Sequence, residues 1–598
     1  MGLFTRIGRE VEFITGLQRT LKASEGVSAE SDISVGDDVE RSVDRYPGNL
    51  AFRFEGRSLT YSEFDALANQ MAHWALAQGL KKGDAVALFM TNRPEYVAIW
   101  VGLAKIGVVT ALINTNLAGA PLTHTIDIAE ADHMILSSDL AEPYLAVAPN
   151  LKRQPKAWAQ GGPVNGAADF DQAIAAQSKD RPPAELRDAI RGADMCLYVY
   201  TSGTTGAPKA ARMPHWRVQG MMRAFIGGGR AAPTDRIYLT LPLYHGTGGL
   251  CGVGFALQTG GAIILRRKFS ATHFWEEARR EEATVFFYIG ELCRYLLNQG
   301  PHPDETRHKL RLAVGNGLRP EVWERFQPRF KIKQILEFYG STEGNVSFLN
   351  FDGKIGAVGR IPSYLKKRLN VRIVKFDVEI EQPVRGPDGL CVECAPDEIG
   401  EALGEIRQDE ARYRFEGYTG DSKQTEKKIL RDVFAKGDAW FRTGDLMRQD
   451  RDGYFYFIDR IGDTFRWKGE NVSTNEVGDV LSLFPGVTEA NVFGVKVGGL
   501  DGRAGMAAIT AGDHLDLEAL HAHVEKNLPS FARPLFLRLQ QQIDTTGTFK
   551  YRKVDLVKDG YDPAATHDPI LFDHPAEKRY VAMTPGLREQ IEAGVFKL

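Results

Sequence analysis

The chain has few cysteines and little net charge. Five cysteines in 598 residues are too few for a disulfide framework and favour a reducing compartment. A formal net charge of -3 gives no electrostatic attraction to DNA or RNA, so nucleic-acid binding is excluded as a function. Cys391 and Cys394 form an isolated CxxC without a second Cys or His pair at zinc-site spacing, which favours a plain loop.

Secretory and membrane-spanning signals are also missing. Charged residues at positions 6, 9, 10 and 12 interrupt any apolar core of a signal peptide. Residues 237–265 contain no Asp, Glu, Lys or Arg, but seven glycines and Pro242 break the stretch. A strand, a turn, a short small-residue helix and a second strand fit this pattern better than a membrane span, which predicts the buried core of an α/β domain.

The N-terminal residues predict an amphipathic helix. Apolar residues recur at steps of three and four, with arginines and a lysine available to the other side. The helix either docks on the body of the protein or lies at a membrane surface, and both alternatives stay open here. The apolar residues are Leu3, Phe4, Ile7, Val11, Ile14, Leu17 and Leu21.

The body of the chain predicts an α/β fold. The length favours two to four compact units. Between residues 84 and 138 the pattern alternates strand, helix, strand, helix, strand, as expected for a parallel sheet with helices on its faces. A second alternation covers 263–339 and a more β-rich portion covers 369–459. From residue 460 a compact unit of helices and strands begins.

A phosphate-binding loop follows the apolar run 195–199. The string YTSGTTGAPK at 200–209 combines small turn residues, whose backbone N–H groups can close on an anion, with hydroxyl donors and a terminal lysine. Its spacing differs from that of the Walker loop. The predicted phosphate-binding residues are Thr201, Ser202, Gly203, Thr204, Thr205, Gly206 and Lys209.

This string resembles the phosphate-loop signature of the adenylate-forming superfamily, which includes acyl-CoA ligases, luciferases and peptide-synthetase adenylation domains. Four further strings match the superfamily in order: FYGSTE (338–343), WFRTGDL (440–446), DRIGDTFRWKGENV (459–472) and TTGTFKYRK (545–553). The resemblance implies a large N-terminal domain of stacked α/β sheets with a β-rich subdomain, expected over residues 1–459. A small, mobile α+β domain is expected over 460–598.

The resemblance also implies roles for residues of the nucleotide site. Tyr339 would lie against adenine, Thr342 would reach the α-phosphate and Glu343 would help to hold Mg²⁺, for which a carboxylate is a suitable ligand. Asp445 would accept the ribose hydroxyls, and Arg460 would contact the ribose. The remaining expected nucleotide-binding residues are Gly315, Asn316 and Gly317 of the adenine-side loop, with Gly340 and Ser341.

Two elements of the C-terminal part differ slightly from the superfamily pattern. Many members place Asp or Lys two residues after the arginine at the domain boundary, whereas this chain has Gly462 and Asp463 there; both are expected in the hinge. Lys550 matches the catalytic lysine, although Phe549 precedes it where most members have glycine. With Lys209 and the magnesium, Lys550 would offset the repulsion between a carboxylate and ATP.

Further strings, among them LPLYHGTGG and TGTFKYRKVDL, are similar to the fatty acid transport protein branch, the very-long-chain acyl-CoA synthetases. The similarity runs from about residue 40 to the C-terminus. It implies an ATP-dependent ligase that makes an acyl-adenylate and then a thioester with coenzyme A. Tyr244, His245 and Gly249 would shape the acyl pocket, within the stretch 237–265 that could line an acyl tunnel; ordinary core packing explains these residues equally well.

The sequence leaves several alternatives open. A sterol or bile-acid side chain could replace the fatty acid, an acyl carrier protein could replace coenzyme A, and fatty acid uptake at a membrane could work by CoA trapping. The expected partners are the small-molecule substrates, with a peripheral membrane contact and a homodimer as open alternatives. We expect the protein in the cytoplasm, with attachment to the inner face of a membrane as the alternative. Chain length preference is not determined.

Overall fold

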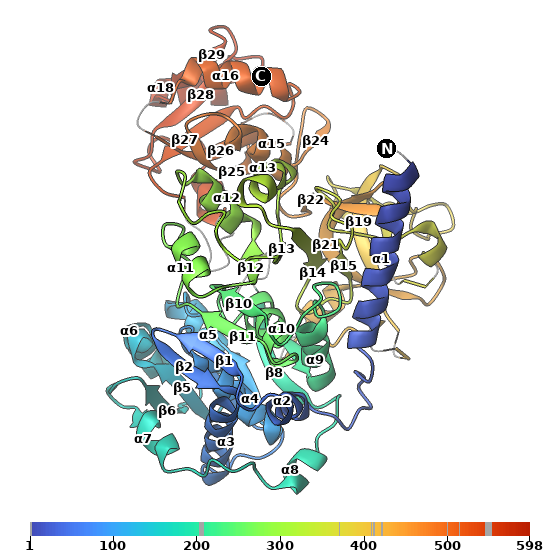
Figure 1. Cartoon of the computed structure of the whole chain (residues 1–598). Helices are drawn as coiled ribbons and strands as arrows, with labels where there is room; N and C mark the ends of the chain where they lie inside the picture. Colours follow the sequence, from blue (N-terminus) through green and yellow to red (C-terminus); the bar gives the residue numbers. More distant parts are fainter. Residues whose placement is uncertain are drawn as a thin grey trace. The chain divides into compact units, whose positions relative to one another are not determined.

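The computed structural model of the chain describes residues 3–201, 208–366, 368–369, 371–407, 409–410, 413–419, 422–498, 500, 502–512, 515–543 and 553–598. It divides into two compact units that we describe separately. Unit 1 comprises Met1–Arg360 and Ile406–Ile429, and unit 2 comprises Ile361–Glu405 and Leu430–Leu598. Both units combine helices with sheets (Figure 1), which confirms the predicted α/β fold class.

The first sheet of unit 1 has the strand order β7-β6-β5-β3-β4-β8-β9. All neighbouring strands run parallel except β8 and β9, as the strand–helix alternation predicts. The strands are β3 (Ala85–Phe89), β4 (Val109–Leu112), β5 (His133–Ser137), β6 (Lys156–Gln160), β7 (Ala168–Asp169), β8 (Met195–Thr201) and β9 (Lys209–Pro214).

Helices pack against this sheet. The helix α4 is buried along its whole length, since apolar residues such as Trp100 occupy every face of the helix. The helix α3 begins after Thr60, which forms a capping box with Glu63. The helical elements are α3 (Tyr61–Ala77), α4 (Pro94–Lys105), α5 (Gly119–Ile128), η1 (Ser138–Leu140), α6 (Ala141–Val147), η2 (Ala148–Asn150), α7 (Phe170–Ala175) and α8 (Ala184–Asp188).

The second sheet of unit 1 has the order β15-β14-β13-β12-β10-β11-β1-β2. The five strands β14, β13, β12, β10 and β11 and the neighbouring β1 run parallel to one another. The strands are β1 (Leu50–Phe54), β2 (Arg57–Thr60), β10 (Arg236–Leu239), β11 (Ala262–Leu265), β12 (Val285–Ile289), β13 (Leu312–Asn316), β14 (Gln334–Gly340) and β15 (Ser347–Leu349), followed by the short β16 (Gly359–Arg360).

The charge-free stretch 237–265 belongs to this second sheet. It forms β10, a π-helical segment η3 (Gly246–Gly252), the helix α10 (Val253–Leu257) and β11, and its Leu250, Val253 and Phe255 are fully buried. The prediction of an α/β core is therefore confirmed. In the described part of the chain, no helix has both the length and the apolar character needed to cross a bilayer. The other helices are α2 (Val35–Arg45), α9 (His215–Arg223), α11 (Phe274–Arg280), α12 (Gly290–Asn298), α13 (Pro320–Phe330) and α14 (Ser422–Lys427).

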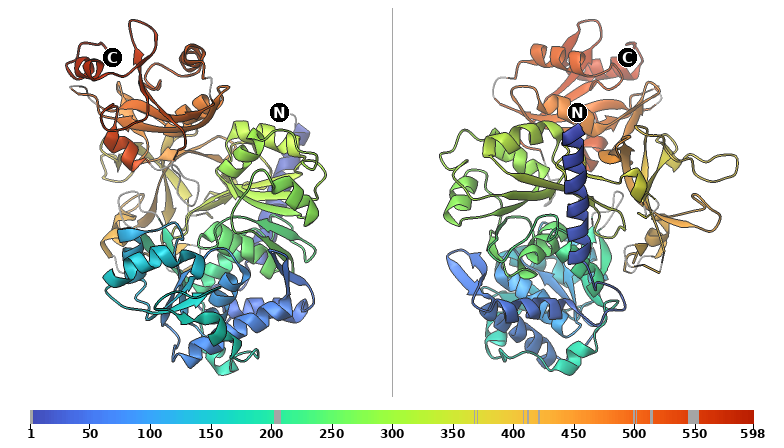
Figure 2. Two further views of the ribbon diagram at one scale, coloured as in Figure 1. Left: turned by 90° about the vertical axis from the view of Figure 1, so that its left-hand side faces the viewer. Right: turned by 45° about the vertical axis from the view of Figure 1, so that its right-hand side comes forward.

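The predicted N-terminal helix forms as α1 (Leu3–Ala23), a long helix seen in full in the right-hand view of Figure 2. It docks on unit 1, but not through its apolar stripe. Phe13 is buried and meets the ring of Phe351 edge-on at 6.0 Å, and Arg19 donates from Nε to the carbonyl of Gly227 at 3.1 Å. The stripe residues Ile7, Val11, Ile14 and Leu21 remain exposed.

Unit 2 contains a β-rich part and a compact C-terminal part. In the first, β22, β21, β19, β17 and β18 neighbour one another in that order. These elements are η4 (Ser363–Leu365), β17 (Val371–Asp377), β18 (Gln382–Pro383), β19 (Ile399–Glu405), β20 (Ile429–Arg431), β21 (Ala439–Gln449), β22 (Tyr454–Arg460) and the hairpin β23 (Phe465–Trp467) and β24 (Glu470–Val472).

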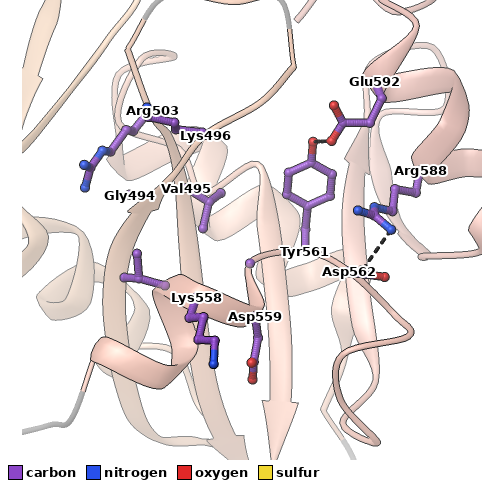
Figure 3. A pocket seen from close by; sticks show the side chains of 12 residues that line it. Gly494, Val495, Lys496, Arg503, Lys558, Asp559, Tyr561, Asp562, Arg588 and Glu592 are labelled. Carbon is purple, nitrogen blue, oxygen red and sulfur yellow. Dashed lines mark hydrogen bonds and ion pairs between the residues drawn. The ribbon is translucent and has the colours of Figure 1, made fainter.

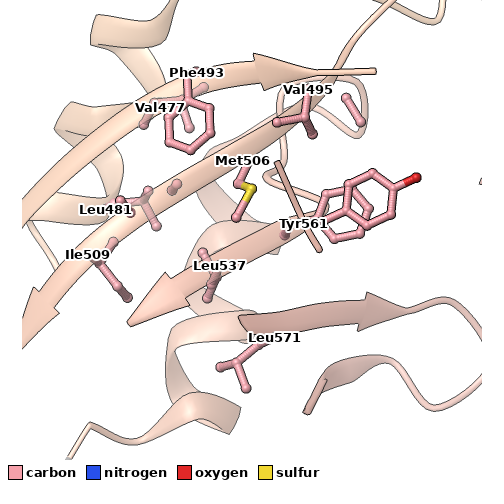
Figure 4. Close-up of a cluster of buried hydrophobic side chains, with 14 of the residues drawn as sticks. Val477, Leu481, Phe493, Val495, Met506, Ile509, Leu537, Tyr561 and Leu571 are labelled. Carbon is pink, nitrogen blue, oxygen red and sulfur yellow. The ribbon is translucent and has the colours of Figure 1, made fainter. Parts of the chain in front are cut away.

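The C-terminal part is built on the sheet β25-β26-β27-β28-β29. Its core places Leu481 of α15 against Met506 and Leu537 of two adjacent strands (Figure 4). The elements are α15 (Thr474–Ser482), β25 (Val487–Val495), β26 (Ala504–Ala511), α16 (Leu517–Asn527), β27 (Phe536–Gln540), α17 (Val554–Asp559), β28 (Ile570–His574), β29 (Arg579–Ala582) and α18 (Pro585–Glu592).

Candidate active site

The two ends of the predicted phosphate loop are fixed by the first sheet. Thr201 ends β8 and Lys209 begins β9, and the two residues pair across the antiparallel ladder. The loop residues Ser202, Gly203, Thr204, Thr205 and Gly206 lie outside the described residues. The Lys209 ammonium donates to Oε1 of Gln424 at 3.0 Å and lies 5.3 Å from the centre of the Tyr418 ring.

The FYGSTE motif begins at the end of β14 in the second sheet and continues into the turn that follows. Tyr339 lies near the end of β14, where its half-buried ring packs 5.8 Å from that of Phe348 on β15. After Gly340 the chain turns, and Oγ of Ser341 accepts from the Gly344 N–H at 3.1 Å. Oε1 of Glu343 accepts a hydrogen bond from the Tyr418 hydroxyl at 2.9 Å.

Tyr418 links the two elements of unit 1 that are expected to bind phosphate. Its segment continues the ladder of β9, since Tyr418 forms a bridge with Ala211 and the Thr419 N–H donates to Ala210. The Tyr418 ring therefore lies between the Lys209 ammonium and the Glu343 carboxylate. Burial and the neighbouring Glu343 raise the pKa of the Tyr418 hydroxyl, so it remains a hydrogen-bond donor at neutral pH.

The expected adenine-side loop ends β13. Gly315 and Asn316 are the last residues of the strand, and Gly317 has a φ of +76°, which favours glycine. The amide oxygen of Asn316 is buried and has no hydrogen-bond partner among the described residues. A buried acceptor without a partner is costly, so this oxygen is available to a donor on a bound molecule.

A buried carboxyl group supports the same loop from below. Oε1 of Glu337 on β14 accepts from the Leu318 N–H at 2.9 Å, and its other oxygen accepts from the Tyr288 hydroxyl. Glu337 is buried, and this desolvation raises its pKa to about 8. The sequence does carry a signal for this buried group, because Glu337 is the only charged residue in the otherwise apolar strand QILEFYG.

Glu337 should therefore make folding stability depend on pH. The unfolded chain releases this proton at its ordinary pKa, whereas the folded chain retains it up to about pH 8. Stability should fall as the pH rises, by roughly 2 to 3 kcal/mol between about pH 6 and about pH 8. Glu337→Gln, which imitates the protonated group, should remove this part of the slope in urea unfolding. Parallel slopes for the two proteins would contradict the prediction.

The predicted acyl-pocket residues lie on one loop beside the FYGSTE turn. Tyr244 is buried, its hydroxyl accepts from the Asn116 amide at 2.8 Å, and burial raises its pKa to about 12. Its ring lies 4.4 Å from that of His245. A β-carbon at Gly249 would lie 1.8 Å from the Leu243 carbonyl oxygen, so the loop can close only with glycine there.

This loop meets the FYGSTE turn, the expected phosphate site, at Gly246. A β-carbon on Gly246 would lie 3.8 Å from Oγ1 of Thr342 and 2.6 Å from the methyl group of Met221. Two strings almost a hundred positions apart in the sequence are therefore neighbours within unit 1. The residue expected to bind the α-phosphate lies beside the residues expected to shape the acyl pocket.

The expected ribose and hinge residues lie in unit 2. Asp445 on β21 pairs with Arg460 on β22, and the Arg460 Nε lies 3.9 Å from Oδ1 of Asp445. Gly462 and Asp463 form the turn that follows, in which the Asp463 N–H donates to the Arg460 carbonyl. Oδ2 of Asp463 lies 3.4 Å from the ammonium of Lys553. Lys550 lies outside the described residues.

Comparison with known proteins decides the family. The AMP-binding enzyme family matches residues 39–393, and the AMP-binding enzyme C-terminal domain matches residues 476–550. Long-chain fatty acid transport protein 6 of Mus musculus is 41% identical over 559 residues, which are 93% of this chain and 90% of that protein. Long-chain fatty acid transport protein 2 of Rattus norvegicus is 42% identical over 91% of this chain and 88% of that protein.

The chain belongs to the long-chain fatty acid transport protein family of AMP-binding enzymes. It is an AMP-forming acyl-CoA ligase that uses ATP and coenzyme A, as the motif order predicted. The fold agrees with solved structures. The anthranilate CoA ligase AuaEII in complex with anthranoyl-AMP has a TM-score of 0.75 at 21% identity, over 91% of this chain and all of that chain. The Mycobacterium tuberculosis fatty acyl CoA synthetase has a TM-score of 0.61 at 22% identity, over 88% and 98%.

In this member of the family, the C-terminal part carries a cavity that no sequence motif predicts. It measures about 390 Å³ and is lined by residues of β25, α17 and α18 (Figure 3). Arg588 pairs with Asp562 at 2.8 Å, and the Tyr561 hydroxyl donates to Glu592. None of the nucleotide, acyl or hinge residues named above lines it.

The isolated Cys391 and Cys394 are free thiols, and the described residues contain no metal-binding cluster of His, Cys, Asp and Glu.

Proposed function

We propose that this family member activates long- or very-long-chain fatty acids, with Thr342 and Lys209 at the phosphates and Tyr244, His245 and Gly249 beside the acyl group. The observation that carries the proposal is the contact of the Gly246 loop with Thr342. Adenylation requires a carboxylate next to the α-phosphate, and a reaction between two held groups needs them about 3 to 3.5 Å apart. The buried, apolar segment that follows Gly246 suits an aliphatic chain.

The nucleotide assignments follow the same proposal. The free amide oxygen of Asn316 can accept from the amino group of a base, and the ring of Tyr339 offers a flat apolar surface. Asp445 and Arg460 would bind the ribose, and residues around Gly462 and Asp463 would form the hinge between a domain at 1–459 and a domain at 460–598. Lys550 would approach the carboxylate during adenylation and withdraw afterwards.

Magnesium would bind at Glu343. Among the described residues, only Tyr418 donates a hydrogen bond to its carboxylate, at Oε1, so the second oxygen can bind a cation. Mg²⁺ is typically held by one or two carboxylates together with substrate phosphates and water. Bound there, the ion would neutralise charge on the triphosphate. Thr342 would position the α-phosphate, and the neighbouring buried loop would exclude water from the mixed anhydride.

A substrate panel tests the proposal. AMP release that depends on ATP and coenzyme A should be fastest with oleate or with a very-long-chain saturated acid, and at least about tenfold slower with a steroid carboxylate, since a rigid ring system would have to displace buried side chains. Fastest release with the steroid acid would favour the bulky-carboxylate alternative. Fatty acid uptake by CoA trapping fits the same chemistry and would show as ligase-dependent accumulation in vesicles.

We further propose that α1 contacts a membrane surface. Its stripe of Ile7, Val11 and Leu21 is 52 to 58% exposed, whereas the helix is held to unit 1 by Phe13 and by the ion pairs Glu12–Arg230 at 3.0 Å and Glu10–Arg360 at 2.7 Å. These pairs neutralise two acidic residues of the helix, and Lys22 lies exposed beside Leu21. An exposed apolar stripe with a basic residue beside it is typical of helices that lie on anionic lipid.

The triple variant Ile7→Ser, Val11→Ser, Leu21→Ser should bind phosphatidylserine-containing vesicles at least about tenfold more weakly, because each side chain loses roughly 1 kcal/mol or more of insertion energy. Sedimentation with vesicles measures this. The matched control is Val554→Ser with Val595→Ser, which removes valines that are 79 and 65% exposed in unit 2. Equal binding by the triple variant and by the unmodified chain would contradict membrane contact through α1.

A further inference from the structure

Arg217 is a buried cation with no ion-paired carboxylate among the described residues. It lies in the first turn of α9 and is 8% exposed. Among the described residues no carboxylate lies within ion-pair distance of its guanidinium. Burial lowers the pKa of Arg217, and the charges of Glu343 and Glu416 oppose this shift only in part. An unpaired buried charge is costly, and such costs are found at functional sites more often than elsewhere.

The guanidinium of Arg217 donates hydrogen bonds to backbone carbonyl groups of the phosphate-site turn. Its Nε and Nη2 donate to the Thr342 carbonyl at 2.9 and 2.6 Å, and Nη2 also donates to the Gly344 carbonyl. On the other side of the turn, Oγ of Ser341 accepts from the Gly344 N–H. The Arg217 side chain therefore fixes the two carbonyls that flank Glu343. The positive charge of its guanidinium lies directly behind Thr342 and Glu343.

The same helix face reaches the acyl side of the site. Met221 lies one turn after Arg217, so the two side chains share a face of α9. The methyl group of Met221 packs against Gly246, where the acyl-side loop meets Thr342. α9 therefore supports both elements that must bring a carboxylate and an α-phosphate together.

We propose that Arg217 is a positioning residue for adenylation, which fixes the Thr342–Gly344 turn and places a permanent positive charge behind the α-phosphate site. The inference rests on the proposed assignment of Thr342 to that phosphate. Preorganised charge counts most in a buried site, where no solvent has to reorganise during the reaction. The cost of leaving Arg217 unpaired in the folded chain is offset when a polyanionic nucleotide binds.

Three substitutions separate the charge of Arg217 from its hydrogen bonds. Arg217→Lys keeps the charge, Arg217→Gln keeps a carbonyl-binding donor, and Arg217→Met keeps neither. Pyrophosphate exchange into ATP with oleate should fall about 30-fold in the Met and Gln variants and no more than about fivefold in the Lys variant, on the scale of one lost electrostatic contact in an active site. Thioester formation from preformed oleoyl-adenylate should change less than threefold, a split that general loosening of the fold would not produce.

Arg223→Met is the matched structural control. Arg223 lies on the same helix and pairs with both oxygens of Asp38 at 2.6 and 2.7 Å, so its loss should lower the unfolding temperature but leave exchange per folded molecule within about threefold. Equal exchange in the Lys and Gln variants would overturn the role of the charge, and that comparison stands even when Arg217→Met fails to fold. No exchange by the unmodified chain would instead refute the proposed function.

Discussion

Replacing Lys550 by alanine is expected to lower the rate of acyl-adenylate formation by about 1,000-fold, the upper range for loss of one preorganised charge. A carboxylate that approaches ATP brings two anions together, and two unit charges about 4 Å apart repel by roughly 4 kcal/mol at an effective dielectric constant near 20. The lysine would offset this repulsion. Thioester formation from preformed acyl-adenylate should be unchanged, because the nucleophile of that step is a thiol and the carboxylate has already formed its mixed anhydride with the α-phosphate.

The two half-reactions are measured separately, by pyrophosphate exchange and by consumption of synthetic acyl-adenylate with coenzyme A. Lys558→Ala is a suitable control, since it removes an exposed lysine from α17, a few positions further along the chain. It should leave both steps within about twofold, as expected for a surface substitution. Equal losses in both half-reactions of Lys550→Ala would show that Lys550 does not act specifically in adenylation.

Replacing Glu343 by glutamine should slow adenylation by about 100-fold or more and raise the magnesium concentration needed for half-maximal exchange, because a neutral amide is a much weaker magnesium ligand than a carboxylate. The amide oxygen can still accept the hydrogen bond from Tyr418 that the carboxylate accepts. The loss would therefore report the missing charge and not a missing contact. Exchange rates measured over a magnesium titration test this directly.

Glu416→Gln provides the control for Glu343→Gln. It removes an equal charge two residues before Tyr418 without touching the hydrogen bond to Glu343. Its magnesium dependence should match that of the unmodified chain, with exchange within about threefold. An unchanged magnesium dependence in Glu343→Gln would exclude Glu343 as the ligand and would move the site to other carboxylates.

Much of the fold was predictable because local patterns determine it. The run Met195–Val199 predicts a buried strand, and it forms the core of β8. The glycines and Pro242 in the charge-free stretch predict breaks: Pro242 lies between β10 and η3, and Gly260 and Gly261 lie between α10 and β11. The family was predictable for a similar reason, since a phosphate loop and a magnesium carboxylate need particular residue types at fixed spacings.

The less predictable features depend on packing between distant segments. Tyr418 and Arg217 carry no local motif, and their roles follow only from the neighbours that the fold supplies, Glu343 and the carbonyls of Thr342 and Gly344. The helix α1 was predicted, but its docking face was not. Phe13 and Gly16 pack on Phe351, whereas the more regular stripe of Ile7 and Val11 faces outward.

The sequence by itself determined the family, the order of the elements and the chemistry of the motifs, because these depend on residue type and spacing along the chain. Only the tertiary structure decided that the Gly246 loop lies beside Thr342, that Arg217 binds the carbonyls of the turn and that burial raises the pKa of Glu337 under the expected adenine-side loop. These features arise from burial and from contacts between residues far apart in sequence. No local pattern records either of them.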